Sequence, residues 1–130
     1  MPVPDEIPPD CIAYRMIEKI NIKPDGTPNS DSFTDMGPTS DTYYMSIYLR
    51  DQLLDEGWTV QGLKAEWEGY EAFEITVGEL REHGELVWRA PMGKIPGHAA
   101  VKRPQNAERT RGQKRKLAKT FRLATEEPEA

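Results

Sequence analysis

The sequence has little of what metal sites and covalent catalysts are commonly built from. Its 130 residues include one cysteine, Cys11, and two histidines, His83 and His98. A single cysteine cannot form an intrachain disulfide, and no CxxC, HxxxH or HExxH spacing occurs, so we predict no metal site. The phosphate-binding patterns GxxxxGKS/T and GxGxxG and the nucleophile elbow GxSxG are absent as well. These absences exclude the familiar motif-based classes, and we expect no cofactor.

Long apolar runs are also absent. No stretch approaches the roughly 20 apolar residues that span a bilayer, so we expect no contact with a membrane. The N-terminal stretch MPVPDEIPPD is acidic and rich in proline, the reverse of a secretory signal. We predict that residues 1–10 are a disordered leader and residues 125–130 a disordered acidic tail. The lone cysteine suits a reducing compartment, and we predict a cytoplasmic location.

What remains has the composition of a folded domain, with 37% hydrophobic and 30% charged residues. We predict a single domain over residues 11–124, because a chain of this length buries one core. Apolar alternation between turn residues predicts four strands, at residues 11–17, 71–77, 85–91 and 98–101. The fold class is therefore α+β, with a small mixed or antiparallel sheet of about four strands, packed helices and a basic C-terminal helix.

Two helices have clear boundary signals. Thr76 and Glu79 form a capping-box pattern that opens a short helix, VGELREH, before Gly84. Near the C-terminus, Gly112 weakens an early helix start, so residues 113–124 are predicted as the firm helix.

One segment fits two structures. Within residues 42–56, Met45, Ile47 and Leu49 alternate as in a strand, whereas the overall spacing of apolar residues nearly fits a helix. We predict a helix over at least residues 47–56.

Charge is distributed unevenly. Residues 102–122 contain nine of the seventeen Lys and Arg residues and a single acid, Glu108, whereas residues 1–101 carry eighteen acids against eight basic residues. The basic segment either folds back onto the acidic body or contacts a partner, and the pattern leaves both open. In the second case the expected binding residues are Arg115, Lys119 and Arg122.

Residues 102–122 have the charge density to contact nucleic-acid phosphates. However, Phe121 is the only aromatic residue in the segment, and the overall pI of 5.1 is low for a nucleic-acid binder. We therefore favour a protein as the partner.

His98 is the best candidate for a catalytic residue. It follows Gly97 where a turn-rich segment enters a short apolar strand, a place where an imidazole is both anchored and accessible. The favoured interpretation is nevertheless a histidine that pins the loop by bonding to its carbonyl groups, with catalysis as the alternative. His83, at the end of a short helix, fits a favourable interaction with the helix dipole.

Two further candidates precede His98. Arg15 interrupts an otherwise apolar strand, and an outward-facing side chain at the strand's end is the favoured interpretation, with an anionic substrate group as the alternative. Residues 21–41 form a long loop rich in Pro, Ser and Asp, a type that is often functional. Phe33 and Met36 are expected to pin this loop to the core and to hold Ser32 near the anchor.

These landmarks occur together as AYR (13–15), SDSF (30–33), MSI (45–47), EAFEITVGELREHG (71–84), GHAAV (97–101) and KRKLAK (114–119). In this combination the chain resembles a family of small, uncharacterised bacterial proteins with the same strand, loop, strand–helix–strand and basic-helix order. The chain departs from the family at Tyr48, where a small acidic or amide residue is expected. The resemblance implies a fold and a functional face rather than a reaction. The polar positions that coincide with the shared pattern are Tyr14, Arg15, Ser32, Ser46 and His98.

Two functions follow as hypotheses. The first is an interaction module of a bacterial or phage-encoded system that binds a protein partner partly through its basic helix, with Tyr14 and Ser46 as further binding residues. The second is a small enzyme in which His98 is the general acid or base, Arg15 binds an anionic group and Ser32 assists. A cleft in which Arg15, Ser32 and His98 converge would favour the enzyme, whereas the same residues scattered, with an exposed apolar patch beside the helix, would favour the module.

Overall fold

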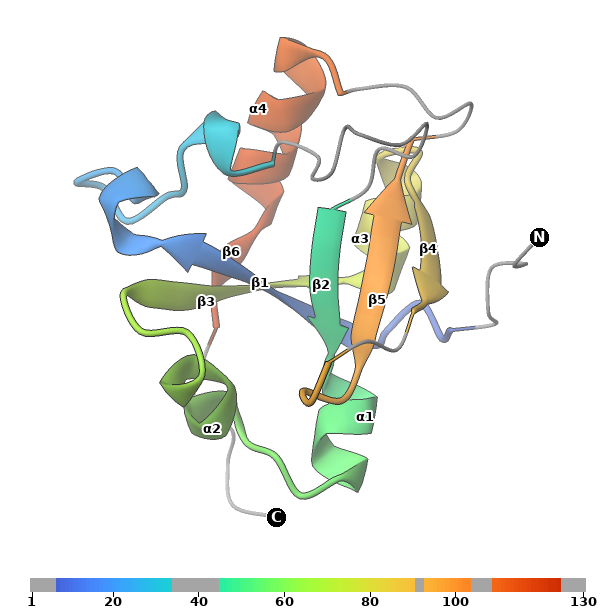
Figure 1. Ribbon diagram of the computed structural model, residues 1–130. Helices are drawn as coiled ribbons and strands as arrows, with labels where there is room; N and C mark the ends of the chain where they lie inside the picture. Colours follow the sequence, from blue (N-terminus) through green and yellow to red (C-terminus); the bar gives the residue numbers. More distant parts are fainter. Residues whose placement is uncertain (1–6, 34–44, 91–92, 104–108, 125–130) are drawn as a thin grey trace.

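The computed structural model describes residues 7–33, 45–90, 93–103 and 109–124. Within these residues six strands form one sheet in the order β4-β5-β2-β1-β3-β6, and all neighbouring strands are antiparallel (Figure 1). The strands are β1 (Ile12–Glu18), β2 (Met45–Leu49), β3 (Tyr70–Thr76), β4 (Leu86–Arg89), β5 (His98–Lys102) and β6 (Arg122–Leu123). The α+β class is confirmed, whereas the predicted number of about four strands is wrong.

The first additional strand is β2. The predicted helix over residues 47–56 is wrong in its first part, because β2 runs to Leu49 and helix α1 (Arg50–Asp55) begins only at Arg50. Strand β2 is paired along four residues with β5, from Met45 opposite Val101 to Tyr48 opposite His98. The alternating apolar pattern therefore prevails over the helical spacing because the sheet supplies a partner strand.

The second additional strand, β6, shortens the predicted C-terminal helix. Helix α4 spans Arg111–Thr120, and the chain then pairs with β3 through residues 122–123. At its start, the Thr110 side chain accepts a hydrogen bond from Gln113 N while the Gln113 side chain accepts one from Thr110 N. This capping box satisfies two backbone donors and includes Gly112 in the helix.

The remaining elements are helices α2 (Val60–Ala65) and α3 (Val77–Glu82) and the 3-10 turns η1 (Lys19–Asn21) and η2 (Ser30–Phe33). Helix α3 begins at the predicted capping box of Thr76 and Glu79. None of the helices among the described residues is long and apolar enough to cross a membrane.

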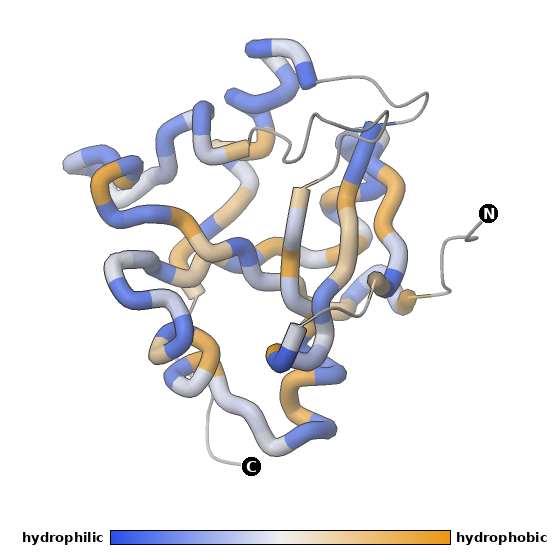
Figure 2. Tube along the Cα trace, in the orientation of Figure 1, coloured by the Kyte–Doolittle hydropathy of each residue, from blue (hydrophilic) through white to orange (hydrophobic). Residues whose placement is uncertain are grey.

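Apolar residues on both faces of the sheet are buried, as Figure 2 shows along the strands. On β1, Ala13 and Ile17 join the core that contains residues of α3, α4 and η2, whereas Tyr14 and Met16 join the core that contains residues of α1 and α2. Strand β1 is therefore an interior strand with apolar side chains on both faces.

Turn η2 is fixed to helix α4 by two aromatic rings. Phe33 is fully buried, and its ring centroid lies 4.9 Å from that of Phe121. The prediction that Phe33 anchors the long loop is confirmed, whereas Met36 lies outside the described residues. Ile7, near the start of the described chain, is also buried in this core.

Candidate functional site

The sheet divides between its two central strands. Strand β1 pairs with β3 along its full length, from Ile12 to Glu18, but its pairs with β2 are limited to Ala13–Leu49 and Tyr14–Tyr48. Beyond these two pairs the strands diverge, and Figure 1 shows β2 and β5 running steeply across β1 and β3. The candidate site lies where the two halves separate.

Arg15 connects the diverging strands. Its Nη1 donates to the Ser46 carbonyl oxygen at 2.8 Å, and its Nε and Nη2 donate to the Ser32 carbonyl oxygen at 3.2 and 2.9 Å. The prediction of an outward-facing side chain is therefore wrong. Arg15 therefore connects strand β1 to turn η2 through Ser32 and to strand β2 through Ser46.

Ser46 also bonds to His98 through its side chain. His98 Nε2 lies 3.0 Å from Ser46 Oγ, and His98 Nδ1 lies 2.7 Å from the Ala90 carbonyl oxygen. A carbonyl oxygen only accepts, so Nδ1 carries the proton, and in the neutral imidazole Nε2 accepts the Ser46 hydroxyl proton. This is the geometry of a serine whose hydroxyl is activated by a base that a third group orients.

The histidine is held firmly in place. Its side chain is only 3% exposed, and its ring centroid lies 5.6 Å from that of Tyr48 in an edge-to-face arrangement. Ala90 N additionally donates to the His98 carbonyl oxygen at 3.0 Å. Ser46, by contrast, is half-buried rather than buried.

The turn before His98 requires a glycine. Gly97 has φ of 85°, and a Cβ there would lie 2.8 Å from the Leu49 carbonyl oxygen. Its carbonyl oxygen accepts a bond from Leu49 N at 2.7 Å. Gly97 thus lets the chain approach the end of β2 closely enough to place His98 opposite Tyr48.

Tyr14, Tyr48 and His98 occupy one row across three neighbouring strands. Tyr14 is opposite Tyr48, and Tyr48 is opposite His98, so the three side chains lie on the same face of the sheet. Tyr14 is 1% exposed and belongs to the core, and burial raises the pKa of Tyr48. Tyr48 therefore packs beside the Ser46–His98 pair, with Tyr14 next to it in the row.

A polar pocket of about 200 Å³ adjoins Arg15. It lies along the part of β1 that β2 leaves unpaired, and Ser32 of η2 forms its other side. Within the described residues the buried Ser32 hydroxyl has no hydrogen-bond partner. The polar residues that line the pocket are Arg15, Glu18, Asn21, Asp31, Ser32 and Tyr70.

The basic segment is divided between the body of the protein and solvent. Arg109 is 4% exposed, and its Nη2 and Nε donate to the Glu85 carboxylate at 2.7 and 3.1 Å. Arg103 Nη1 donates to the His83 carbonyl oxygen at 2.6 Å and lies 3.4 Å from Glu85 Oε2. This part of the segment therefore folds back onto the acidic body.

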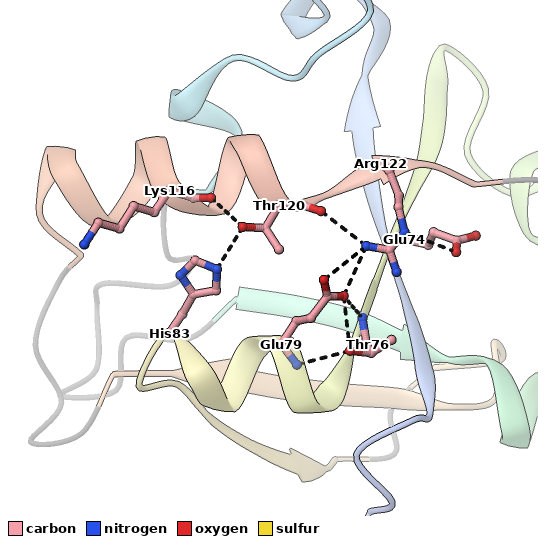
Figure 3. A network of polar contacts seen from close by, with 7 residues as sticks. All are labelled: Glu74, Thr76, Glu79, His83, Lys116, Thr120 and Arg122. Atoms are coloured by element: carbon pink, nitrogen blue, oxygen red, sulfur yellow. Dashed lines mark hydrogen bonds and ion pairs between the residues drawn. The ribbon is translucent and has the colours of Figure 1, made fainter.

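Arg122 is likewise engaged within the chain. It lies 3.1 Å from Glu79 and 3.7 Å from Glu74, and Figure 3 shows these contacts beside the hydrogen bond between His83 and Thr120. Thr120 Oγ1 donates to the Lys116 carbonyl oxygen, so it accepts from His83 Nε2 at 2.9 Å. The connection from α4 to β6 is thus held at Thr120 by His83, which follows α3, and at Arg122 by Glu79 of α3 and Glu74 of β3. By contrast, the two other predicted binding residues, Arg115 and Lys119, are exposed.

Of the predicted catalytic residues, Arg15 and Ser32 are in direct contact, and His98 is joined to them through Ser46. Sequence patterns mark Arg15, Ser32, Ser46 and His98 as candidates, but they do not predict that Ser46 is the partner of His98. No local signal connects two residues 52 positions apart. The buried pair of Glu85 and Arg109 was missed for the same reason. Among the described residues, no group of three or more His, Cys, Asp and Glu side chains is arranged to hold a metal ion.

Comparisons of the chain with protein-family models, with curated proteins and with solved structures find no match. The function of the protein is therefore inferred from the geometry of the site itself.

Proposed function

We propose that the protein is a small hydrolase or acyltransferase in which Ser46 is the nucleophile and His98 the general base. The observation that carries the proposal is the chain of hydrogen bonds from Ser46 Oγ to His98 Nε2 and from His98 Nδ1 to the Ala90 carbonyl oxygen. The pocket beside Arg15 is lined by Arg15 and Ser32 but not by His98, so the three residues meet the expectation for an enzyme only in part. The exposed large apolar residues, by contrast, come from four separate elements: Ile20, Leu54, Leu86 and Leu123.

The reaction follows from the positions of the protons. Ser46 Oγ attacks the carbonyl carbon of an ester while its proton passes to His98 Nε2, and the imidazolium then returns that proton to the leaving alkoxide or thiolate. Water then attacks the acyl–Ser46 carbonyl carbon while His98 Nε2 accepts its proton, and the imidazolium returns that proton to the departing Ser46 Oγ. Throughout, the Nδ1 proton stays on the imidazole, held by Ala90.

The orienting group limits the class of substrate. Ala90 offers a neutral carbonyl oxygen, which stabilises an imidazolium less than the carboxylate of a full triad does. We therefore propose activated substrates, namely small carboxylic esters or thioesters, whose leaving groups need little protonation. Arg15 is a positioning residue in this scheme, because it fixes the Ser46 carbonyl group. The proposal includes a cytoplasmic location, which is supported by the lone cysteine and the charged composition.

Covalent labelling tests the nucleophile directly. We expect a fluorophosphonate probe to add one label to the folded protein, and peptide mass spectrometry to locate it on Ser46. Ser46→Ala should remove the label, and His98→Gln should slow labelling by about 10²–10⁴-fold. Ser30→Ala is the matched control, since Ser30 lies outside the pocket beside Arg15 and makes no contact with His98, and it should retain labelling.

Hydrolysis of p-nitrophenyl acetate provides the second measurement on the same variants. A folded wild-type protein that shows neither labelling of Ser46 nor Ser46-dependent ester hydrolysis would contradict the proposal. So would labelling that persists at the wild-type rate in a folded His98→Gln variant. Thermal unfolding of each variant distinguishes loss of chemistry from loss of structure.

A further inference from the structure

A second cavity, separate from the pocket beside Arg15, lies between helix α4 and the turn that precedes η2. It has a volume of about 390 Å³. One wall is formed by Arg115 and Lys119, one helical turn apart on α4, and the other by the segment from Lys23 to Ser30. We call this cavity the basic groove.

The walls of the basic groove are fixed by hydrogen bonds and packing. Lys23 N donates to the Thr27 carbonyl oxygen and Gly26 N donates to the Lys23 carbonyl oxygen, both at 2.8 Å. A β-bridge between Ile22 and Pro28 closes the turn. Turn η2 follows directly, and its aromatic contact with α4 holds this wall against the helix. Because the groove is already formed before binding, a ligand binds without the entropic cost of ordering the groove.

The charges of the groove are largely unmatched. Lys23, Arg115 and Lys119 form no ion pair within the described part of the chain, in contrast to the paired Arg109 and Arg122. One carboxylate, Asp25, shares the wall. It accepts hydrogen bonds from the hydroxyl and the backbone N of Thr27, which lower its pKa. The groove therefore has three cations and one carboxylate that is already hydrogen-bonded, and it attracts an anion.

The surroundings decide which kind of anion fits. A long nucleic acid would have to cross a body that carries the excess of acidic residues, and none of the residues that line the groove is aromatic, so bases have nothing to stack on. A short acidic peptide places its carboxylates in the groove, and its backbone meets the amide and hydroxyl of Asn29 and Ser30. Opposite charges of this kind guide association and set specificity.

We propose that the basic groove binds an acidic segment of a partner protein. The groove uses no residue of the Ser46–His98 pair, so it serves as a docking surface that brings the partner to the enzyme, independently of the chemistry at Ser46.

Fluorescence polarisation with a fluorescein-labelled octaglutamate peptide tests the proposal on the full-length protein at low salt. We expect saturable binding that weakens as salt rises, and a Kd raised by about tenfold or more in Arg115→Glu/Lys119→Glu. The matched control is Lys94→Glu/Lys116→Glu, which changes the net charge equally at exposed positions outside the groove, and its Kd should stay within about twofold of the wild-type value. An octaglutamine peptide should not bind.

Three outcomes would overturn the proposal: no saturable binding of octaglutamate, an equal loss of binding in both double variants, or tighter binding of a single-stranded oligonucleotide of matched charge. The first would show that the groove does not bind an acidic peptide, the second that net charge rather than the groove is responsible, and the third would assign the groove to nucleic acid. Ester hydrolysis of Arg115→Glu/Lys119→Glu should equal that of the wild type, which separates this proposal from the one at Ser46.

Discussion

Ser46 and His98 are diagonal neighbours across the pairing of β2 and β5, and their side chains meet at 3.0 Å. The residues directly opposite them are Ala100 and Tyr48, respectively. The small Ala100 leaves room for the imidazole to lean along the strand towards Ser46, whereas Tyr48 supports the ring from the other side. The relationship depends on the register of two strands and not on any local motif.

The register of β2 against β5 should therefore be sensitive to substitution of Gly97. We expect Gly97→Ala to lower the free energy of unfolding by about 2–4 kcal/mol, because it combines a positive φ with a Cβ that meets the Leu49 carbonyl oxygen. Gly93→Ala is the control, since Gly93 also has a positive φ of 70° but open space around its Cα. Urea unfolding of both variants measures the difference. Equal losses would show that the close contact with Leu49 is unimportant.

Arg15 should contribute to stability through the carbonyl groups it binds. We expect Arg15→Met to cost about 2–3 kcal/mol of unfolding free energy, because the Ser32 and Ser46 carbonyl oxygens lose charge-assisted donors. Arg15→Lys should recover only part of this loss, since an ammonium group lacks the planar fork that reaches both oxygens. Chemical denaturation monitored by tryptophan fluorescence checks both values. An Arg15→Met variant as stable as the wild type would show that these hydrogen bonds do not stabilise the fold.

The buried pair of Glu85 and Arg109 should behave as a unit. Removing one partner, as in Arg109→Met, leaves a carboxylate at 1% side-chain exposure without its main donor and should cost about 3–5 kcal/mol. The double variant Glu85→Leu/Arg109→Met should regain a large part of that loss. Arg111→Met, at an exposed position nearby, is the control and should change stability by less than about 0.5 kcal/mol. Additive losses in the double-mutant cycle would contradict the pairing.

Glu79 links stability to pH. Partial burial would raise its pKa, but hydrogen bonds from Thr76 and the ion pair with Arg122 outweigh burial and lower it. A carboxyl whose pKa is lower in the folded state stabilises the fold above its unfolded pKa of about 4.3, and this contribution is lost as the pH falls through the folded pKa.

Glu79→Gln keeps the capping box but removes the charge, so we expect it to be less stable than the wild type at about pH 6 and equally stable at about pH 2. Urea midpoints across this range provide the measurement, with Glu82→Gln on the same helix as the control. A difference that is independent of pH would show that the charge of Glu79 plays no part.

Local patterns predicted the parts of the fold that local interactions determine. Strand β3 and helix α3 follow from alternation and from the capping box of Thr76 and Glu79, all within a few residues of one another. Strand β2 could not be predicted in the same way, because its sequence also fits a helix. Only its pairing with β5 makes the strand the preferred structure. The two-residue strand β6 carries no sequence pattern at all.

The candidate site was predicted as a set of residues but not as an arrangement. A Gly-His step, an arginine within a strand and serines beside an aromatic anchor mark positions of interest, yet none states which side chain meets which. The pairing of Ser46 with His98, and of Arg15 with two carbonyl groups, requires strands from distant parts of the chain. Arg15 was expected to face outward because its partners are backbone atoms, which no sequence pattern identifies.

The division of the sheet has a consequence for how the protein folds. Strands β4 and β5 are close in sequence, whereas β1 must find β3, and β2 must find β5, across fifty residues or more. Because distant pairings close large loops, these two pairings form late. The contact between Ser46 and His98 depends on the pairing of β2 with β5, so the proposed catalytic centre is among the late features to assemble. Separation of β2 from β5 would abolish the proposed chemistry while the pairing of β1 with β3 persists.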